Sequence, residues 1–338
     1  MTSSPELLFR YRDAIEREVV RSLPPSSSPL DEMLRFYFGW TEEGAPSLAK
    51  CLRPSLCLTA CESLGGDVEQ ALPIAVAIEL VHNFSLIHDD IEDGDEMRHH
   101  RPALWHAYGR QPAIFAGVAL WSIAYQTLDR ALERGLAAER VLAARRVLND
   151  ACLEMIEGQH LDLSYEQRSD VTLAEYIDMI GRKSGALLGA SLQLGALVAG
   201  CDDEECERFA TFGRQLGLAF QIRDDVLGIW GEGSATGKPV GADIARKKKS
   251  LPVVHAFQQV VGPDRDILVD AYGKDEVDEA DIAEVLSILQ RWNCRYFAQG
   301  LAEDYRSRAM EELSRTPISP EARRSFDELM SFVLERDY

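Results

Sequence analysis

Three aspartates close an apolar stretch of the sequence, in the segment LIHDDIED over residues 86–93. On a helix, Asp89 and Asp93 would lie one turn apart with Asp90 beside them, which makes an oxygen-rich face. Neighbouring acids are common in a chain with 56 Asp and Glu residues among 338, so this segment alone is also typical of a solvated acidic turn. A second feature is needed to separate the two interpretations.

A second pair of aspartates, Asp224 and Asp225, closes another apolar stretch in the segment FQIRDD over residues 220–225. Two apolar helices that end in paired aspartates can face each other across a cavity. Their carboxylate oxygens would bind a hard cation such as Mg²⁺, which keeps several waters and takes its other ligands from substrate phosphates. Bound cations reverse the local sign of the electric field, so an acidic site of this kind can hold a diphosphate.

Basic residues near both clusters fit the same chemistry. Arg makes bidentate contacts with phosphate, whereas Lys acts as a point charge. Each of these residues alone is more typical of a solvated surface, and only their combination indicates a diphosphate site. They are Lys50, Arg53, Arg98, Arg101, Arg182, Lys183, Lys238 and the run from Arg246 to Lys249.

The composition limits the partners of this chain. There are 36 Lys and Arg residues against 56 Asp and Glu residues, which gives a formal net charge of −20. This charge argues against nucleic acid, whose phosphates need a basic surface, and against docking on anionic lipid. The longest apolar stretch, over residues 71–81, is broken by Glu79 and is shorter than the ~20 residues of a membrane span, so we expect no stable membrane insertion.

The N-terminal segment and the cysteines favour a cytoplasmic location. The opening residues, MTSSPELLFRYRDAIEREVV, carry charges where a signal peptide needs an apolar core. The 7 cysteines are scattered along the chain without a C-x-x-C motif. Zinc sites and disulfide frameworks are therefore not expected, and we interpret the cysteines as buried thiols in a reducing compartment.

The elements that must position these residues are predicted to be helices. Apolar residues recur at three- and four-residue spacing, and alternating strand patterns are nearly absent. We therefore predict an all-α fold with a single large helical domain over residues 29–338. Residues 1–28 are predicted to form an N-terminal helix and linker, because residues 22–29 are rich in Ser and Pro. The predicted helices span residues 48–66, 68–88, 111–134, 137–161, 172–199, 203–229, 278–314 and 319–335.

Over about residues 48–252 the sequence resembles the trans-isoprenyl diphosphate synthases, or polyprenyl synthetases, with weaker similarity up to the C-terminus. The family's first aspartate-rich motif corresponds to DDIEDGDEMRHHRPALW over residues 89–105. Its second corresponds to GLAFQIRDDVLGIWGEGSATGKPVGADIARKKKSLP over residues 217–252. Several separated blocks in the right order make this resemblance more specific than one acidic motif.

The resemblance implies a single all-helical isoprenoid synthase fold around a deep central cavity, assembled as a homodimer. In this family Mg²⁺ ions, about three in each active site, join both aspartate motifs to an allylic prenyl diphosphate. The allylic diphosphate ionises, the double bond of isopentenyl diphosphate attacks the allylic cation, and a proton is lost to the released diphosphate. The implied product is a short-chain prenyl diphosphate of C15–C20, with geranylgeranyl length preferred.

The resemblance also assigns roles to individual residues of this sequence. The metal ligands would be Asp89, Asp93, Asp224 and Asp162, with Asp90 and Asp225 beside them as catalytic residues and Gln159 supporting the metal site. The allylic diphosphate would be held by Arg98, Lys183, Ser184, Gln221, Lys238 and Lys248, of which Lys183 and Gln221 are also expected to be catalytic. Isopentenyl diphosphate would be held by Lys50, Arg53, His82 and His99.

The sequence departs from the family pattern at several positions. Gly228 stands where the second aspartate motif often ends in a third aspartate. On the isopentenyl side, Cys51 and His99 stand where the family has basic residues, and the chain ends at Tyr338 without a family arginine. The allylic side is nearly complete, so the departures are concentrated on the isopentenyl side.

This asymmetry leaves two function classes open. A prenyltransferase needs both diphosphate sites, whereas a terpene cyclase or diphosphate lyase derived from this fold would ionise a finished prenyl diphosphate and need no isopentenyl site. A non-catalytic partner of another synthase is disfavoured, because both aspartate clusters are present. Lys50, Arg53 and His82 remain, and His99 can bind phosphate as imidazolium, so the prenyltransferase is the leading hypothesis.

Phe84 and Ser85 are the expected chain-length residues. In the family the product grows down a cavity whose floor is set on the helix before the first aspartate motif, about one turn below Asp89. A bulky Phe84, with no two-residue insertion in the motif, resembles members that stop near geranylgeranyl length. The nearby aromatic residues are interpreted as core or dimer-interface packing without a catalytic role, and they are Trp105, Tyr108, Phe115, Trp121 and Tyr125.

Overall fold

The computed structural model describes residues 5–23, 28–40, 51–99, 101–231 and 240–335. Within these ranges the chain is built almost entirely from helices, and the β structure is one short antiparallel hairpin that pairs Met97 with Pro102 and Arg98 with Arg101. The prediction of an all-α fold is confirmed.

The N-terminal half begins with η1 (Glu6–Leu8), α1 (Arg12–Ser22), α2 (Pro29–Tyr37), α3 (Leu52–Ser63) and α4 (Val68–Asp93). The hairpin strands β1 (Met97–Arg98) and β2 (Arg101–Pro102) follow, and then α5 (Leu104–Tyr108), α6 (Arg110–Asp129) and α7 (Ala138–Tyr165).

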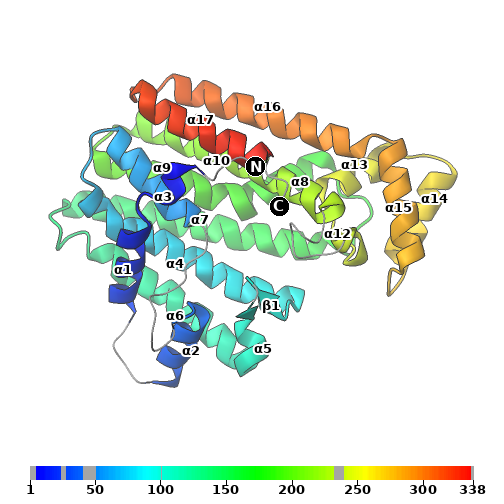
Figure 1. The fold of residues 1–338 in the computed structure, drawn as a ribbon, viewed down its shortest axis with the longest axis horizontal. Coiled ribbons are helices and arrows are strands. Elements are labelled where there is room, and N and C mark those ends of the chain that lie inside the picture. The colour runs from blue at the N-terminus through cyan, green and yellow to red at the C-terminus, as the bar shows by residue number, and fades with distance from the viewer. Residues whose placement is uncertain (1–4, 24–27, 41–50, 100, 232–239, 336–338) are drawn as a thin grey trace.

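The C-terminal half comprises α8 (Leu173–Ile180), the π-turn η2 (Gly181–Gly185), α9 (Ala186–Ala199), α10 (Asp203–Trp230), α12 (Ala242–Ala245) and α13 (Leu251–Gln259). The last elements are α14 (Pro263–Gly273), α15 (Glu279–Arg291), α16 (Cys294–Ser314) and α17 (Pro320–Glu335). Figure 1 shows several of the long helices running along the long axis, with α14 and α15 at one end.

Helix α4 lies at the centre of the fold. Every residue from Ala71 to Val81 is buried, which is expected of a helix that is apolar on all sides and surrounded by others. Among the described residues it alone is long and apolar enough to cross a membrane, but 72% of its most apolar window is buried inside the fold. It begins at Asp67, whose side chain accepts the Glu69 amide, and ends at Gly94 with φ +68°. The helix therefore carries the first aspartate motif on its last turn.

Two predicted helices are interrupted in the structure. The segment 172–199 contains the π-turn η2, which widens the helix at the residues that face the cavity. The segment 278–314 is divided between α15 and α16, because Asn293 takes a left-handed conformation with φ +54°. Asn tolerates this conformation better than other non-glycine residues, and this signal for a break was present in the sequence.

The N-terminal segment is packed onto the rest of the chain. Leu7 and Leu8 of η1 and Ile15 and Val19 of α1 are buried in the hydrophobic core. The carboxylate of Glu18, also buried, forms ion pairs with arginines at the end of α6 and just beyond it, at 3.1 Å to Arg130 and 2.6 Å to Arg134. The division of the chain at residue 28 stays a prediction.

Glycines let the central helices approach one another closely. A Cβ on Gly195 of α9 would lie 2.3 Å from the backbone oxygen of Cys57 in α3. This distance is far below van der Waals contact, so α3 and α9 can pack at their observed separation only with glycine here. The close packing fixes α3, whose first turn carries Arg53.

We expect Gly195→Ala to lower the free energy of unfolding by about 1–3 kcal/mol, because the added methyl group overpacks the contact with α3. Gly300 in α16 is the matched control, since it is exposed and has open space around its Cα. Gly300→Ala should raise the free energy of unfolding by about 0.5–1 kcal/mol through helix propensity. Urea unfolding followed by circular dichroism measures both, and equal effects of the two substitutions would contradict the packing argument.

Candidate active site

A cavity of about 990 Å³ opens beside the C-terminal end of α4. Its wall is formed by residues of α3, α4, α7, η2 and α10, together with the segment around the hairpin. Both aspartate motifs reach it, through Asp89 and Asp90 of α4 and through Asp224 of α10. Only α4 ends at its aspartates, because α10 continues to Trp230, so the prediction that Asp224 and Asp225 close a helix is wrong.

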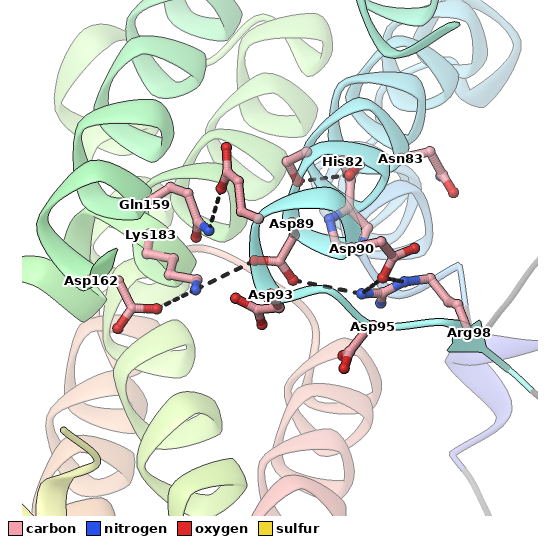
Figure 2. A network of polar contacts seen from close by, with 12 residues as sticks. His82, Asn83, Asp89, Asp90, Asp93, Asp95, Arg98, Gln159, Asp162 and Lys183 are labelled. Atoms are coloured by element: carbon pink, nitrogen blue, oxygen red, sulfur yellow. Dashed lines mark hydrogen bonds and ion pairs between the residues drawn. The ribbon is translucent and has the colours of Figure 1, made fainter. Parts of the chain in front are cut away.

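The first aspartate motif is surrounded by cations from separate elements (Figure 2). Asp89 lies 3.6 Å from Lys183 Nζ of η2 and 3.6 Å from Arg98 Nη2 of β1. Asp93, one turn further along α4, lies 3.2 Å from Lys248 Nζ. The two contacts of Asp89 are longer than a direct hydrogen bond, whereas Lys248 donates a hydrogen bond to Asp93.

Asp90 is held differently from Asp89 and Asp93. Its Oδ1 accepts from Arg98 Nη2 at 2.5 Å and from Arg98 Nε at 2.7 Å. The residue is buried, and burial raises the pKa of its carboxyl while Arg98 opposes the rise. Its Oδ2 has no hydrogen-bond partner among the described residues. Asp90 therefore fixes Arg98 at the edge of the cavity.

The opposite wall is built on the π-turn η2. Lys183 Nζ donates to Asp162 Oδ2 at 2.5 Å, and although burial lowers the pKa of this lysine, the carboxylates of Asp162 and Asp89 outweigh burial and raise it. Ser184 Oγ donates to Gln221 Oε1 at 2.6 Å. An ammonium that stays charged and an oriented hydroxyl thus face the aspartates of α4.

The paired aspartates of α10 have separate surroundings. Asp224 lines the cavity, whereas Asp225 is buried outside its lining. The carboxylate of Asp225 accepts from the Tyr176 hydroxyl, from the Leu251 amide at 2.6 Å and from Gln221 Nε2 at 3.2 Å. Burial raises the pKa of Asp225 to about 7. In this structure Asp225 reaches the cavity through Gln221 and not directly.

Three of the residues expected to bind isopentenyl diphosphate, Arg53, His82 and His99, line the same cavity. Burial lowers the pKa of Arg53 to about 10, against the nearby carboxylates of Glu79 and Asp224, and its Nε has no hydrogen-bond partner among the described residues. Burial and the neighbouring Arg53, Arg98 and His99 lower the pKa of His82 well below 6.5, so its imidazole is neutral. A donor without a partner and a neutral imidazole beside it suit an incoming anion.

Other predicted basic residues are not placed, or are already engaged with the scaffold. Lys50 and Lys238 lie outside the described residues. Arg101 donates to backbone carbonyls of Phe36 and Tyr37, and Arg182 pairs with Glu157 and Asp178. Lys249 Nζ donates to the Glu166 carbonyl at 2.9 Å. These three described basic residues hold the scaffold around the site.

Sequence reasoning missed the polar group of Glu79, Asn83 and Tyr37. The Tyr37 hydroxyl donates to Asn83 Oδ1 at 2.9 Å, and Asn83 Nδ2 donates to Glu79 Oε1 at 3.3 Å. Glu79 lines the cavity, and burial raises the pKa of its carboxyl against the effect of Arg53. A single acid inside an otherwise apolar buried helix was the signal that could have revealed it.

Phe84 and Ser85 also line the cavity, on α4 below Asp89. The Phe84 ring packs edge-on against His88, with centroids 4.9 Å apart. A Cβ on Gly117 of α6 would lie 2.5 Å from the His88 imidazole and 3.6 Å from the Phe84 ring, so glycine makes room for both rings. The position predicted for the floor of the cavity is therefore occupied by packed aromatic side chains.

The donor set fits divalent metal ions. Carboxylate oxygens of Asp89, Asp93 and Asp224 are hard ligands, and lysine ammonium groups already compensate the charge of two of them. Among the described residues no group of three or more His, Cys, Asp or Glu side chains is placed to hold a metal ion by itself. Water and substrate phosphates would have to complete the coordination.

The family model for polyprenyl synthetases matches residues 42–289. The (2E,6E)-farnesyl diphosphate synthase of Mycobacterium tuberculosis is 35% identical over 95% of this chain and 89% of its own. A short chain isoprenyl diphosphate synthase of Methanothermobacter thermautotrophicus is 40% identical over 86% of this chain and 87% of its own. The crystal structure of geranylgeranyl pyrophosphate synthetase from Pyrococcus horikoshii has 36% sequence identity and a TM-score of 0.88, with 98% of each chain covered.

The chain belongs to the polyprenyl synthetase family and is an enzyme of the prenyltransferase class. The fold predicted from the resemblance is confirmed, and so is the prediction of a short-chain prenyltransferase. The cyclase alternative finds no support, because the relatives named here are all prenyl diphosphate synthases.

Asp225 gives the site a pH-dependent stability. Its pKa lies near 7 in the folded protein and near 3.8 when exposed, so between about pH 4 and pH 7 the folded state binds a proton that the unfolded state loses. Unfolding then becomes more favourable as pH rises, by up to about 1.4 kcal/mol per pH unit, and the effect levels off above about pH 7.

We expect Asp225→Asn to remove this component, because asparagine keeps an acceptor oxygen but does not titrate. Urea unfolding of both proteins in the presence of a chelator should show the variant gaining stability relative to wild type as pH rises. Asp304→Asn on the exposed surface of α16 is the control and should show a constant difference. A constant difference for Asp225→Asn as well would contradict the assignment.

Proposed function

We propose that this enzyme condenses isopentenyl diphosphate with an allylic prenyl diphosphate in a Mg²⁺-dependent reaction, giving a prenyl diphosphate of C15–C20. The observation that carries the proposal is one cavity lined by aspartates of both α4 and α10, by the cations Arg98, Lys183 and Lys248, and by Phe84. The named relatives support it, since one is a farnesyl diphosphate synthase and another a geranylgeranyl pyrophosphate synthetase.

The residues of the allylic side would act by binding and orientation. Mg²⁺ ions held by Asp89, Asp93 and Asp224, with Asp162 nearby, would supply positive charge to the leaving diphosphate. Lys183 and Lys248 face these carboxylates at 3.6 and 3.2 Å and can move to the diphosphate oxygens. Ser184 and Gln221 are hydrogen-bonded to each other and can orient the diphosphate. The C–O bond breaks and the diphosphate departs with the bonding electron pair.

The isopentenyl side would hold the second diphosphate beside the allylic carbon. Arg53 offers a buried guanidinium and His82 a neutral imidazole, while His99 lines the cavity at the hairpin turn with φ +49°. The double bond of isopentenyl diphosphate attacks the allylic cation to form a C–C bond. The proton then lost passes to the released diphosphate, so the chain need not provide a separate base.

A homodimer is part of this proposal. Apolar side chains on α6 and α7 are exposed in the single chain, with Phe115 at 69%, Val118 at 47% and Leu153 at 55%. A row of this kind is typical of an interface that a second copy would cover. We also propose a cytoplasmic location, in line with 7 cysteines that are all free thiols.

Incubation with labelled isopentenyl diphosphate, an allylic diphosphate and Mg²⁺ tests the proposal. We expect label in a prenyl diphosphate, no turnover in excess chelator, and a rate at least about 10²-fold lower for Asp89→Ala. Asp304→Ala serves as the surface control. Unchanged activity in chelator would refute the metal assignment, and hydrocarbon formed from a single prenyl diphosphate without label would refute the condensation.

Phe84→Ala should lengthen the product, because it opens the cavity below Asp89 without removing a charged group. We expect chromatography of the products to show a longer prenyl diphosphate than wild type makes. Phe297→Ala on α16, where the ring stacks on His255 away from the cavity, should leave product length unchanged. An unchanged product from Phe84→Ala would place the floor on another helix.

A further inference from the structure

Two ion pairs join the end of the first aspartate motif's helix to the last part of the second motif. Asp93 pairs with Lys248 at 3.2 Å, and Asp95 pairs with Arg246. Asp93 and Asp95 are separated by a single residue, and so are Arg246 and Lys248, so the two ion pairs are neighbours. We call Asp93–Lys248 the inner pair and Asp95–Arg246 the outer pair. The residues involved lie 151 and 155 positions apart in the chain.

The backbone of both residues in the outer pair is held by hydrogen bonds. The Asp95 amide donates to the Asp90 carbonyl at 3.0 Å, and the Asp95 carbonyl accepts from Trp105 Nε1 at 2.9 Å. Arg246 caps the end of α12, with its amide donating to the Ala242 carbonyl at 3.2 Å. The Asp95–Arg246 contact thus joins the turn after α4 to the turn that leads to Lys248.

The inner and outer ion pairs must behave differently when substrate binds. If Asp93 binds metal and Lys248 binds diphosphate, as the proposed function requires, the inner pair has to separate. Asp95 and Arg246 need not change partners, because neither is required as a ligand. Of the two ion pairs described between these segments, the outer pair is then the one that stays closed.

We infer that Asp95 and Arg246 are positioning residues that hold the segment 240–250 in register with the end of α4 while Lys248 moves from Asp93 to the substrate. This inference rests on the proposed function. The side chain of Asp95 is 15% exposed and that of Arg246 is 38% exposed, so the pair is partly shielded from water and is stronger than a fully solvated one.

Hydrogen–deuterium exchange tests the register without turnover. The Lys248 amide donates to the Asp243 carbonyl at 2.9 Å and the Lys247 amide to the Ile244 carbonyl at 2.9 Å, so both report on the turn. With Mg²⁺ and inorganic pyrophosphate bound, we expect peptides over 240–250 to stay protected in wild type. In Arg246→Gln they should exchange about three- to tenfold faster.

A double-mutant cycle tests the pair itself. We expect Asp95→Asn and Arg246→Gln each to lower kcat/KM about tenfold, through both a higher KM for the allylic diphosphate and a lower kcat. The kcat/KM of the double variant should be no lower than that of the less active single variant, since either change breaks the same contact. The matched control is the Asp264–Arg291 pair between α14 and α15, at 2.7 Å, whose variants should keep wild-type kinetics.

The outcomes separate this inference from the proposed function. The positioning role is overturned if kcat/KM of the single variants stays within twofold of wild type, or if the two losses multiply in the double variant. It is also overturned if exchange over 240–250 is unchanged in Arg246→Gln. Equal losses in the control pair would overturn it too, because they would show a general effect of removing ion pairs. If wild type does not condense the substrates, the proposed function fails, while the exchange measurement still decides whether the pair holds the segment.

Discussion

The gathering of like charges at the end of α4 is the constraint on which the rest of the site depends. Asp89, Asp90 and Asp93 lie within about one turn, at the helix end where the macrodipole is also negative. Two unit charges 4 Å apart interact with about 4 kcal/mol at an effective dielectric constant of 20. Compensating cations must therefore be close, and Arg98, Lys183 and Lys248 supply them from three separate elements. The packing of the central region brings these cations to the end of α4.

To place Lys183 opposite α4, backbone segments must approach more closely than a side chain larger than glycine's would allow. A Cβ on Gly158 of α7 would lie 2.2 Å from the Lys183 amide nitrogen, and a Cβ on Gly217 of α10 would lie 2.6 Å from the Gly185 Cα. These two glycines let α7 and α10 press on η2 from both sides. The wide turn is then fixed where Lys183 and Ser184 can face α4, which connects helix packing directly to the charge balance.

Much of this arrangement could be predicted from the sequence, because it depends on periodicity and on residue types. Asp89 and Asp224 belong to recognisable motifs, and the apolar runs before them indicate buried helices. The sequence could not separate the roles of Asp224 and Asp225, since adjacent residues of one type acquire different surroundings only through contacts with distant elements such as Tyr176 and Leu251. For the same reason, the pairing of Asp95 with Arg246 is invisible without the fold.

Positive charge is already present on the isopentenyl side, where the sequence departs from the family pattern. Arg53, Arg98 and His99, together with burial, lower the pKa of His82 far enough to keep it neutral. A permanent cation in place of His99 would act on His82 beside Arg53, whose own pKa burial lowers to about 10. Arginine is always charged at physiological pH, whereas histidine, with an unperturbed pKa of about 6.5, has a charge that depends on its surroundings. With His99 in place of a family arginine, Arg98, which Asp90 holds in place, is a permanent cation of the hairpin on this side of the site.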